Sequence, residues 1–155
     1  MIQRVLNHAR AVDPPGGASH LGLVKQFFPH SATTRDITVR VSVSYLPEQS
    51  EPGKGRWFWA YHIRIENEGA KAVQLVSREW IISDGRGGRD EVRGEGVVGE
   101  QPVLEPGGSF DYVSGCPLTT PTGWMEGRYF MIGADGRAFE VTIPRFPLVA
   151  PAVTS

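Results

Sequence analysis

The sequence has little cysteine and lysine and no long apolar run. Cys116 is the single cysteine among 155 residues, which excludes an internal disulfide and a cysteine-rich zinc site. Lysine occurs three times, so arginine carries nearly all of the positive charge. No stretch approaches the ~20 apolar residues that span a bilayer, and the N-terminus lacks the apolar stretch of a signal peptide. These absences predict a cytoplasmic protein that is not inserted in a membrane.

The charge balance narrows the classes of partner. The formal net charge is −1, so no overall cationic field attracts nucleic acid or an anionic membrane. Hydrophobic residues make up 40% of the chain, which is enough for one packed core. We therefore expect a single soluble domain that binds neither nucleic acid nor a membrane.

Alternation of apolar and polar residues begins at Ile37 and predicts β-strands. Residues 37–45 and 57–67 both alternate with a period of two. Residues 73–84 are also strand-like, but their apolar residues change face near Ser77 and Arg78, which predicts a β-bulge or burial on both faces. Asp135-Gly136 stands between two later strand-like runs and predicts a hairpin.

The positions of glycine and proline between the strand-like segments indicate the fold class. Nineteen glycines and twelve prolines separate about seven short strands, and no segment has a convincing helical period. This pattern predicts an all-β, antiparallel sandwich of the immunoglobulin or fibronectin type III kind over residues 37–148. We expect core packing for six large aromatic residues: Trp57, Trp59, Trp80, Tyr112, Tyr129 and Phe139.

The two ends of the chain lack this alternation. Residues 1–36 have mixed polarity and contain Pro14-Pro15-Gly16-Gly17, which predicts a flexible or loosely docked extension. Two short helices, over "IQRVLNHA" and "LVKQFF", would be marginal on their own. Residues 149–155 form a C-terminal tail.

The stretch "GEGVVG", from Gly94 to Gly99, matches the Gly-x-Gly-x-x-Gly pattern of dinucleotide-binding loops. Such a loop must follow a buried strand and begin a helix, whereas here the preceding segment is polar and Pro102 and Pro106 follow. A weaker hypothesis is an anion-binding nest of backbone N–H groups at Gly94, Gly96 and Gly99, with Arg86, Arg89 and Arg93 supplying positive charge. The alternative is that the glycines serve positive φ angles or close crossing of the sheet, with the arginines balanced by neighbouring carboxylates.

Catalytic and metal-binding patterns are missing. Cys116 precedes Pro117 with no histidine nearby in the sequence, which favours a free structural cysteine. His62 falls with Arg64 and Glu66 on the strand face expected to meet solvent. His8, His20 and His30 are spaced too irregularly for zinc. We therefore expect no enzymatic activity, no cofactor and no metal site.

One long segment resembles the ApaG family. The residues that carry the resemblance are "SREWII" (77–82), "VRGEGVVGEQP" (92–102) and "YVSGCPL" (112–118), continued by "MEG" (125–127) and the strand at 139–146. The resemblance covers about residues 37–148. It implies a fibronectin type III-like sandwich, a role in protein interaction, and a link in bacteria with cobalt tolerance and magnesium efflux. It assigns no catalytic residue, and the family's glycine motif has prompted a pyrophosphate-binding suggestion.

Two functions follow as hypotheses. The first is a non-enzymatic binding module that presents residues 85–99, with Arg86, Arg89 and Arg93, and a sheet edge to a protein partner. The second is a protein that binds pyrophosphate or a nucleotide such as a diadenosine polyphosphate through Arg93, Gly94, Gly96 and Gly99. The sequence leaves homo-oligomer formation open, because edge strands can pair between subunits.

Overall fold

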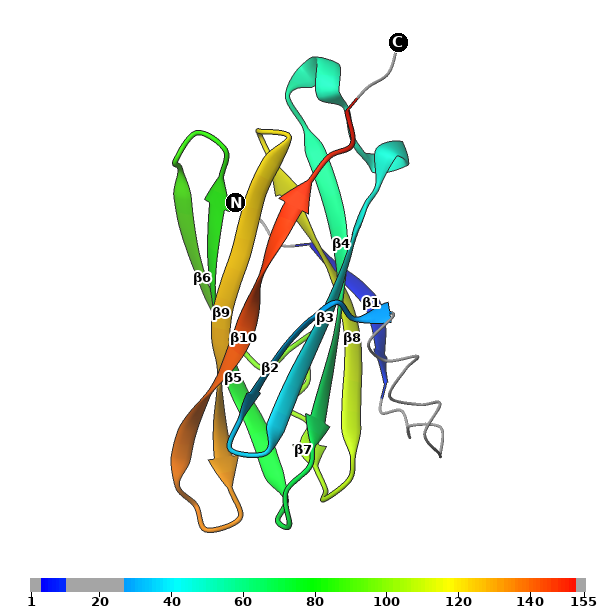
Figure 1. Cartoon of the computed structure of the whole chain (residues 1–155). Helices are drawn as coiled ribbons and strands as arrows, with labels where there is room; N and C mark the ends of the chain where they lie inside the picture. The colour runs from blue at the N-terminus through cyan, green and yellow to red at the C-terminus, as the bar shows by residue number, and fades with distance from the viewer. Residues whose placement is uncertain (1–3, 11–26, 153–155) are drawn as a thin grey trace.

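The computed structural model describes the backbone of residues 4–10 and both backbone and side chains of residues 27–152. Two antiparallel β-sheets pack face to face, with the core between them (Figure 1). Between residues 30 and 152, loops and turns join strands that are adjacent in the sequence, and the named helical elements there are two short 3-10 turns, η1 (Pro47–Gln49) and η2 (Pro52–Lys54). The all-β sandwich predicted from alternation is confirmed.

The strand order places the two sheets' edges. The first sheet has the order β1-β8-β4-β3-β2 and the second β10-β9-β5-β6, while β7 pairs separately with β5. In the described residues there are ten strands, where the sequence predicted about seven. Their bounds are β1 Arg4–Arg10, β2 His30–Thr34, β3 Ile37–Tyr45, β4 Trp57–Asn67, β5 Val73–Asp84, β6 Arg89–Glu95, β7 Val103–Leu104, β8 Ser109–Leu118, β9 Thr122–Gly133 and β10 Ala138–Val149.

The inward faces of both sheets supply a core rich in aromatic residues. Alternate residues of β3 and β4 point inward, as the period of two requires. Trp59, Trp80, Tyr112 and Tyr129 are buried, whereas Trp57 and Phe139 are partly buried and pack against the core. The expected core is therefore confirmed for four of the six aromatic residues, and the other two line its margin.

Two local predictions concern strand geometry, and both are confirmed. The register between β5 and β9 shifts between Leu75 and Ser77, so Val76 is the extra residue of a bulge. The turn between β9 and β10 closes with the N–H of Gly133 donating to the carbonyl of Arg137, and Gly136 has a φ of +81°. Glycine suits that position because a positive φ strains other residues.

The N-terminal region differs from the expectation. Residues 4–10 form β1 on the edge of β8, so the helix predicted over "IQRVLNHA" is wrong there. Residues 30–34 form β2, which pairs in register with β3, so the sandwich begins before residue 37. Pairing with a neighbouring strand outweighs the weak local preference of such short segments. The helix predicted over "LVKQFF" lies mostly outside the described residues.

Candidate functional site

The glycine loop lies on one edge of the second sheet. Both β6 and β7 pair with β5, so the chain runs along β5, leaves it at the glycine loop and returns to it. The N–H of Gly96 donates to the carbonyl of Val76 (2.7 Å), and the N–H of Leu75 donates to that of Pro102 (3.0 Å). The loop thus connects two segments that both pair with β5, and it lies beside the bulge in that strand.

The tip of the loop is a tight reverse turn. Val97 and Glu100 exchange two backbone hydrogen bonds, of 2.8 and 2.9 Å. Val98 and Gly99 between them have φ angles of +44° and +81°, the signs of a type I′ turn. Val97 is fully buried and anchors the turn in the core. The strand β7 follows, so the loop starts no helix, in agreement with the rejection of a dinucleotide fold.

The turn already uses several of the backbone N–H groups that an anion nest would need. The N–H groups of Gly96, Val97 and Glu100 all donate to carbonyl oxygens of the chain itself. Gly96 has a φ of +61°, and a Cβ there would overlap the carbonyl of Glu100. Conformation and close packing therefore account for glycine at positions 96 and 99.

The Arg78 side chain of β5 contacts the loop, and the sequence did not select it as a site residue. Its Nη1 donates to the carbonyls of Glu95 (3.2 Å) and Gly96 (2.8 Å). Its register partner is Gly94, whose missing side chain leaves room for the guanidinium group. Arg78 and the buried Trp80 are two residues apart on β5, so their side chains point to the same face of the sheet. A charged residue at a position that should face the core could have identified Arg78 from the sequence.

The charge of Arg78 also reaches the core. Burial raises the pKa values of Tyr61, Tyr112 and Tyr129 well above the ordinary value, and the nearby guanidinium partly opposes that rise. The hydroxyl groups of Tyr112 and Tyr129 lie 2.6 Å apart. The positive charge of Arg78 therefore acts on the buried tyrosines as well as on the loop.

Of the three arginines selected from the sequence, two lie on β6 and Arg86 lies on the turn before it. Arg93 lies next to Gly94 and is 73% exposed, and its Nε forms an ion pair with Glu79 (2.8 Å). Arg89 stands at the other end of β6, where it meets Glu91 at 3.5 Å. Arg86 lies on the β5–β6 turn, and its backbone N–H donates to Asp84. The structure therefore places Arg93, but not Arg86 or Arg89, beside the glycines.

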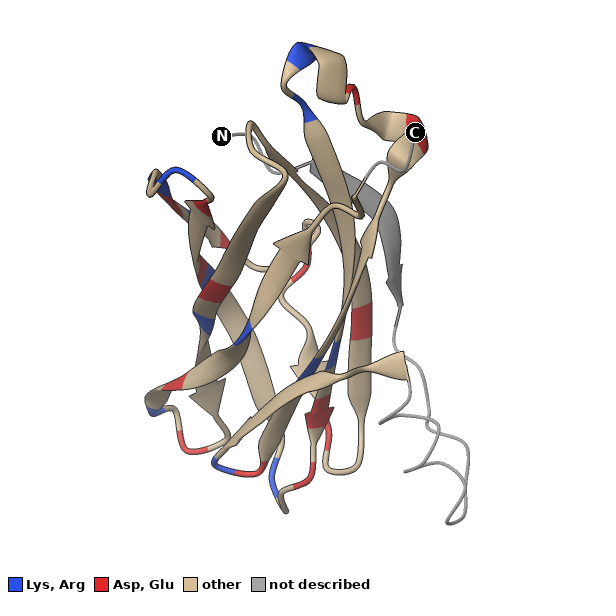
Figure 2. Cartoon of the chain, turned by 45° about the horizontal axis from the view of Figure 1, so that its top comes forward, with Lys and Arg blue, Asp and Glu red and all other residues tan. Residues whose placement is uncertain are grey.

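A surface depression of about 450 Å³ adjoins the glycine loop. Glu79 is nearly buried beside it and pairs with both Arg93 and Arg128, the second at 3.1 Å. Arg128 also lies over the ring of Phe130, 5.2 Å from its centroid. Figure 2 shows charges of both signs interspersed over this sheet. The lining residues are Ser77, Arg78, Glu79, Arg93, Gly94, Glu95 and Phe130.

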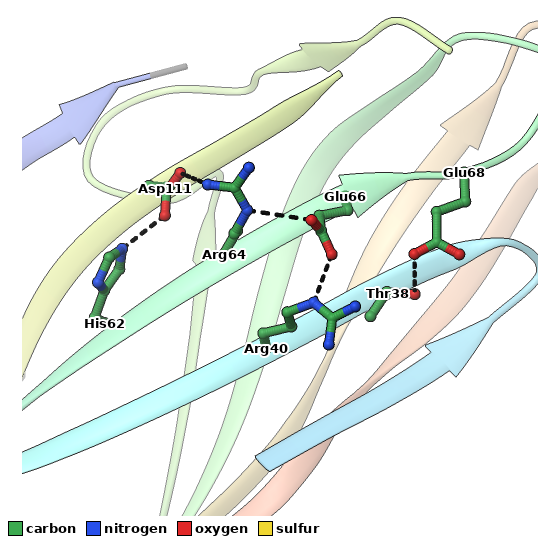
Figure 3. Close-up of polar contacts among 7 residues, drawn as sticks. All are labelled: Thr38, Arg40, His62, Arg64, Glu66, Glu68 and Asp111. Carbon is green, nitrogen blue, oxygen red and sulfur yellow. Dashed lines mark hydrogen bonds and ion pairs between the residues drawn. The ribbon is translucent and has the colours of Figure 1, made fainter. Parts of the chain in front are cut away.

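A second polar group crosses the outer face of the first sheet (Figure 3). Arg64 pairs with Asp111 (3.1 Å) and Glu66 (3.2 Å), Glu66 pairs with Arg40 (2.6 Å), and His62 bonds to Asp111 (2.7 Å). His62 is 41% exposed, but the Arg64 and Asp111 side chains are only 7% and 8% exposed. His62 is thus exposed as expected, whereas its neighbours Arg64 and Asp111 are nearly buried, which paired opposite charges tolerate.

The remaining chemical candidates lie in the core or are dispersed. Cys116, the single cysteine, is buried, and burial raises the pKa of its thiol from 9.0 to about 12, which keeps the thiol protonated. Within residues 27–152, no group of three or more histidine, cysteine or acidic residues is arranged to hold a metal ion. The described part of the chain also contains no helix long and apolar enough to cross a membrane.

The fold and the edge loop define a small all-β sandwich whose distinguishing feature is a glycine turn between two segments of one edge. The chain belongs to the ApaG family: the ApaG domain matches residues 47–133. Protein ApaG of Rhodospirillum centenum is 56% identical over 122 residues, which cover 79% of this chain and 94% of that protein. Protein ApaG of a Bradyrhizobium species is 53% identical with the same coverage.

A solved structure supports the same fold. The ApaA protein of Bordetella pertussis is 50% identical, with a TM-score of 0.74. The comparison covers 76% of this chain and 96% of that protein. The matched part of the sandwich is therefore shared with that protein over nearly its whole length.

Proposed function

We propose that this protein is a non-enzymatic binding module whose partner-binding surface is the glycine loop together with the outer face of β6. The observation that carries the proposal is the depression beside the loop, where Phe130 lies among charged residues of both signs. Interfaces between proteins typically combine an aromatic or arginine anchor with a polar surround. Arg89 and Arg93 are the exposed arginines of β6, and Arg93 is the one next to the loop.

The internal bonding of the loop favours a protein partner. Its tip is held by two mutual backbone bonds, and its base is held by Gly96 and by the side chain of Gln101, which donates to the carbonyl of Val76 (2.9 Å). A surface that is already ordered loses little conformational freedom when it binds. Such preorganisation suits recognition of another surface. It leaves fewer backbone donors for a small anion.

The buried cysteine supports a function without chemistry on a bound substrate. Nucleophilic catalysis requires an accessible thiolate beside a base, whereas the Cys116 thiol is buried and its pKa is raised. The proposed role therefore depends on surface recognition alone.

Binding to purified candidates tests the proposal. Proteins retained by the immobilised chain from extract of its own cells would be purified and titrated against the parent protein, Arg93→Glu and the control Lys54→Glu. Lys54 lies on η2 and is similarly exposed, at 71%. We expect Arg93→Glu to weaken binding at least ~10-fold, because it reverses a charge inside the interface. Equal affinities for all three proteins would exclude this surface.

A second candidate function is binding of a phosphate-containing anion, and the position of Arg78 favours it. Among the described residues Arg78 has no carboxylate partner within ion-pair distance, and its recorded acceptors are neutral carbonyls beside the glycines. An arginine not neutralised by an acid is suited to phosphate recognition. We infer that Arg78, with Arg93, would supply the charge at Gly94, Gly96 and Gly99.

Amide chemical shifts test this second function. Pyrophosphate, ATP and diadenosine tetraphosphate would be titrated into the parent protein and into Arg78→Gln. Shifts of the Val98 and Gly99 amides in the parent that disappear in Arg78→Gln are expected. Unmoved amides at millimolar ligand would eliminate the anion site, and shifts that persist in Arg78→Gln would assign the charge elsewhere.

We propose that any effect of this protein on cobalt or magnesium is indirect, through its partner. The absence of a three-ligand cluster within residues 27–152 supports this view, because Mg²⁺ is typically held by several oxygen ligands. Calorimetry with Mg²⁺ and Co²⁺ should show no stoichiometric heat. A one-to-one binding isotherm would contradict the proposal.

A further inference from the structure

A surface cavity of about 380 Å³ lies at the end of the sandwich where three turns meet (Figure 1). The turns are residues 35–36 between β2 and β3, residues 68–72 between β4 and β5, and residues 134–137 between β9 and β10. The first joins strands of one sheet, the second crosses between the sheets, and the third joins strands of the other. Loops gathered at one end of a sandwich are a common place for binding sites.

Each of the three turns contributes one positively charged residue to the wall of this cavity. The three are Arg35, Lys71 and Arg137, and all are exposed. In the part of the chain that the structure describes, none of them forms an ion pair. Two carboxylates, Asp36 and Asp135, also line the cavity, and Asp135 accepts the backbone N–H of Arg137 (2.9 Å). Three cations against two carboxylates leave an excess of positive charge at the cavity.

The turn that carries Arg35 has a strained backbone. Arg35 and Asp36 have φ angles of +47° and +65°, and they form the two-residue loop between the paired residues Thr34 and Ile37. A hairpin loop of this kind favours Asn-Gly, because most other side chains are strained at positive φ. The turn itself therefore does not explain an arginine. The guanidinium of Arg35 lies over the ring of Phe139, 5.5 Å from its centroid, so the strained residue places its charge at the cavity. Strain of this kind clusters at ligand-binding sites.

The turn between β4 and β5 adds backbone donors to the same cavity. The N–H groups of three lining residues, Ala70, Lys71 and Ala72, have no hydrogen-bond acceptor among the described residues. Asn67 holds this turn, because its Oδ1 accepts the N–H of Gly69 (3.0 Å) and its Nδ2 donates to the carbonyl of Lys71 (2.8 Å). The donors are thus ordered before a ligand arrives, which lowers the entropic cost of binding. The glycine loop differs, since most of its N–H groups donate to its own carbonyls.

We propose that this cavity binds a small organic phosphate, that is, a phosphate monoester with a compact organic group. Such a phosphate carries a charge of roughly −1.5 to −2 at pH 7, which suits several cations, whereas one arginine would neutralise a carboxylate. Arginine side chains and successive backbone N–H groups are common phosphate donors. The cavity has the volume of a small-molecule site, and Phe139 and Val73 on its wall offer apolar contact to the organic group. The site shares no residue with the glycine loop and does not depend on its function.

Titration of the full chain with phenyl phosphate, inorganic phosphate and phenol tests the ligand class. Phenyl phosphate should cause saturable shifts of the amides at residues 69–72 and 134–137, which weaken as ionic strength rises. Inorganic phosphate should bind at the same amides but less tightly, because it lacks a ring to contact Phe139. Phenol at the same concentration should move none of them. Shifts confined to Val98 and Gly99 would place the anion at the glycine loop and would overturn the proposal, as would equal responses to phenol and phenyl phosphate.

Arg35→Asn separates binding from folding. Asparagine removes the charge but tolerates a positive φ better than arginine, so the variant should melt at or above the temperature of the parent. Its affinity for phenyl phosphate should nevertheless fall at least ~10-fold, the size expected for a lost charge-assisted hydrogen bond.

Lys71→Gln removes the charge of a second turn and should weaken binding in the same direction. The matched control is Lys54→Gln, because Lys54 is 71% exposed and lies on η2, which Figure 1 shows at the opposite end of the sandwich. This control should bind phenyl phosphate like the parent. Parent-like affinity in both Arg35→Asn and Lys71→Gln, or an equal loss in Lys54→Gln, would overturn the proposal.

Discussion

The guanidinium group of Arg78 lies directly against the Cα of Gly94: a Cβ at that glycine would come within 2.7 Å of Nη1 and 3.0 Å of Cζ. Gly94→Ala should therefore displace Arg78 from the carbonyls of Glu95 and Gly96. We expect a loss of about 1 kcal/mol in the free energy of unfolding, the size of a typical hydrogen-bond contribution. Urea denaturation measures it.

A double-mutant cycle is the control for that prediction. In an Arg78→Ala background the guanidinium is absent, so Gly94→Ala should cost nothing there and should even help slightly, because alanine restricts the unfolded chain. An equal cost in both backgrounds would show that the glycine serves some other purpose.

Gly96 and Gly99 both have positive φ angles but differ in the space around them. A Cβ at Gly96 would overlap the backbone of Glu100, whereas nothing lies within 4 Å of a Cβ at Gly99. Gly99→Ala should cost about 1 kcal/mol for the backbone conformation alone. Gly96→Ala should cost at least ~2 kcal/mol more, because the turn must move. Thermal unfolding of the two variants provides the comparison, and similar melting temperatures would contradict it.

Glu79 joins two arginines at the outer face of the second sheet. Its side chain is 9% exposed and pairs with Arg93 and Arg128. Glu79→Gln should lower the free energy of unfolding by about 1–2 kcal/mol. The loss is smaller than for a fully buried ion pair because both arginines are substantially exposed. The matched control is Glu126→Gln. Glu126 pairs with Arg145 at 3.6 Å on an exposed part of the same face. This substitution should change the free energy of unfolding by less than ~0.5 kcal/mol. Denaturant titrations that fail to separate the two variants would remove Glu79 from this role.

The raised pKa of Cys116 predicts a loss of stability at alkaline pH. The folded state disfavours the thiolate, so the thiol has a pKa of 9.0 in the unfolded chain and of about 12 in the folded protein. The stability that the protonated thiol contributes is complete below pH 9.0 and is lost as pH rises toward about 12. The slope approaches ~1.4 kcal/mol per pH unit for one proton. Between pH 9 and 10 the unfolding free energy of Cys116→Ala should fall less steeply than that of the parent. The buried tyrosines, whose pKa values are also raised, add their own loss at higher pH.

Thiol labelling checks the same property directly. At pH 8 the native protein should react with iodoacetamide only as fast as it unfolds, and urea should expose the thiol at once. Rapid labelling of the native state would place Cys116 at an accessible position.

Sequence reasoning recovered the parts of the fold that local periodicity controls. The alternation of β3 and β4, the bulge at Val76 and the turn at Gly136 all follow from the spacing of apolar residues and from glycine. It missed β1 and β2, because their segments have no clear period and become strands only by pairing with β8 and β3. Long-range pairing is not encoded in a local pattern.

For the candidate site, the sequence indicated the right loop but not its charges. Gly94, Gly96 and Gly99 were selected by a motif, and Arg93 by proximity in sequence. Arg78 is sixteen positions before Gly94 and reaches it only through the β5–β6 register. Likewise, the pairing of His62 and Arg64 with Asp111 joins residues almost fifty positions apart.

The closed turn at Val97–Glu100 makes the glycine loop a self-contained unit for engineering. Its entry and exit are fixed to β5 on either side, so the chain between Val98 and Gly99 can be lengthened without changing the path of β6 or β7. A fluorophore attached there would lie on the loop that follows β6, outside the paired residues of β6 and β7. A change in the fluorescence of this label would report binding of a partner even before the partner is identified.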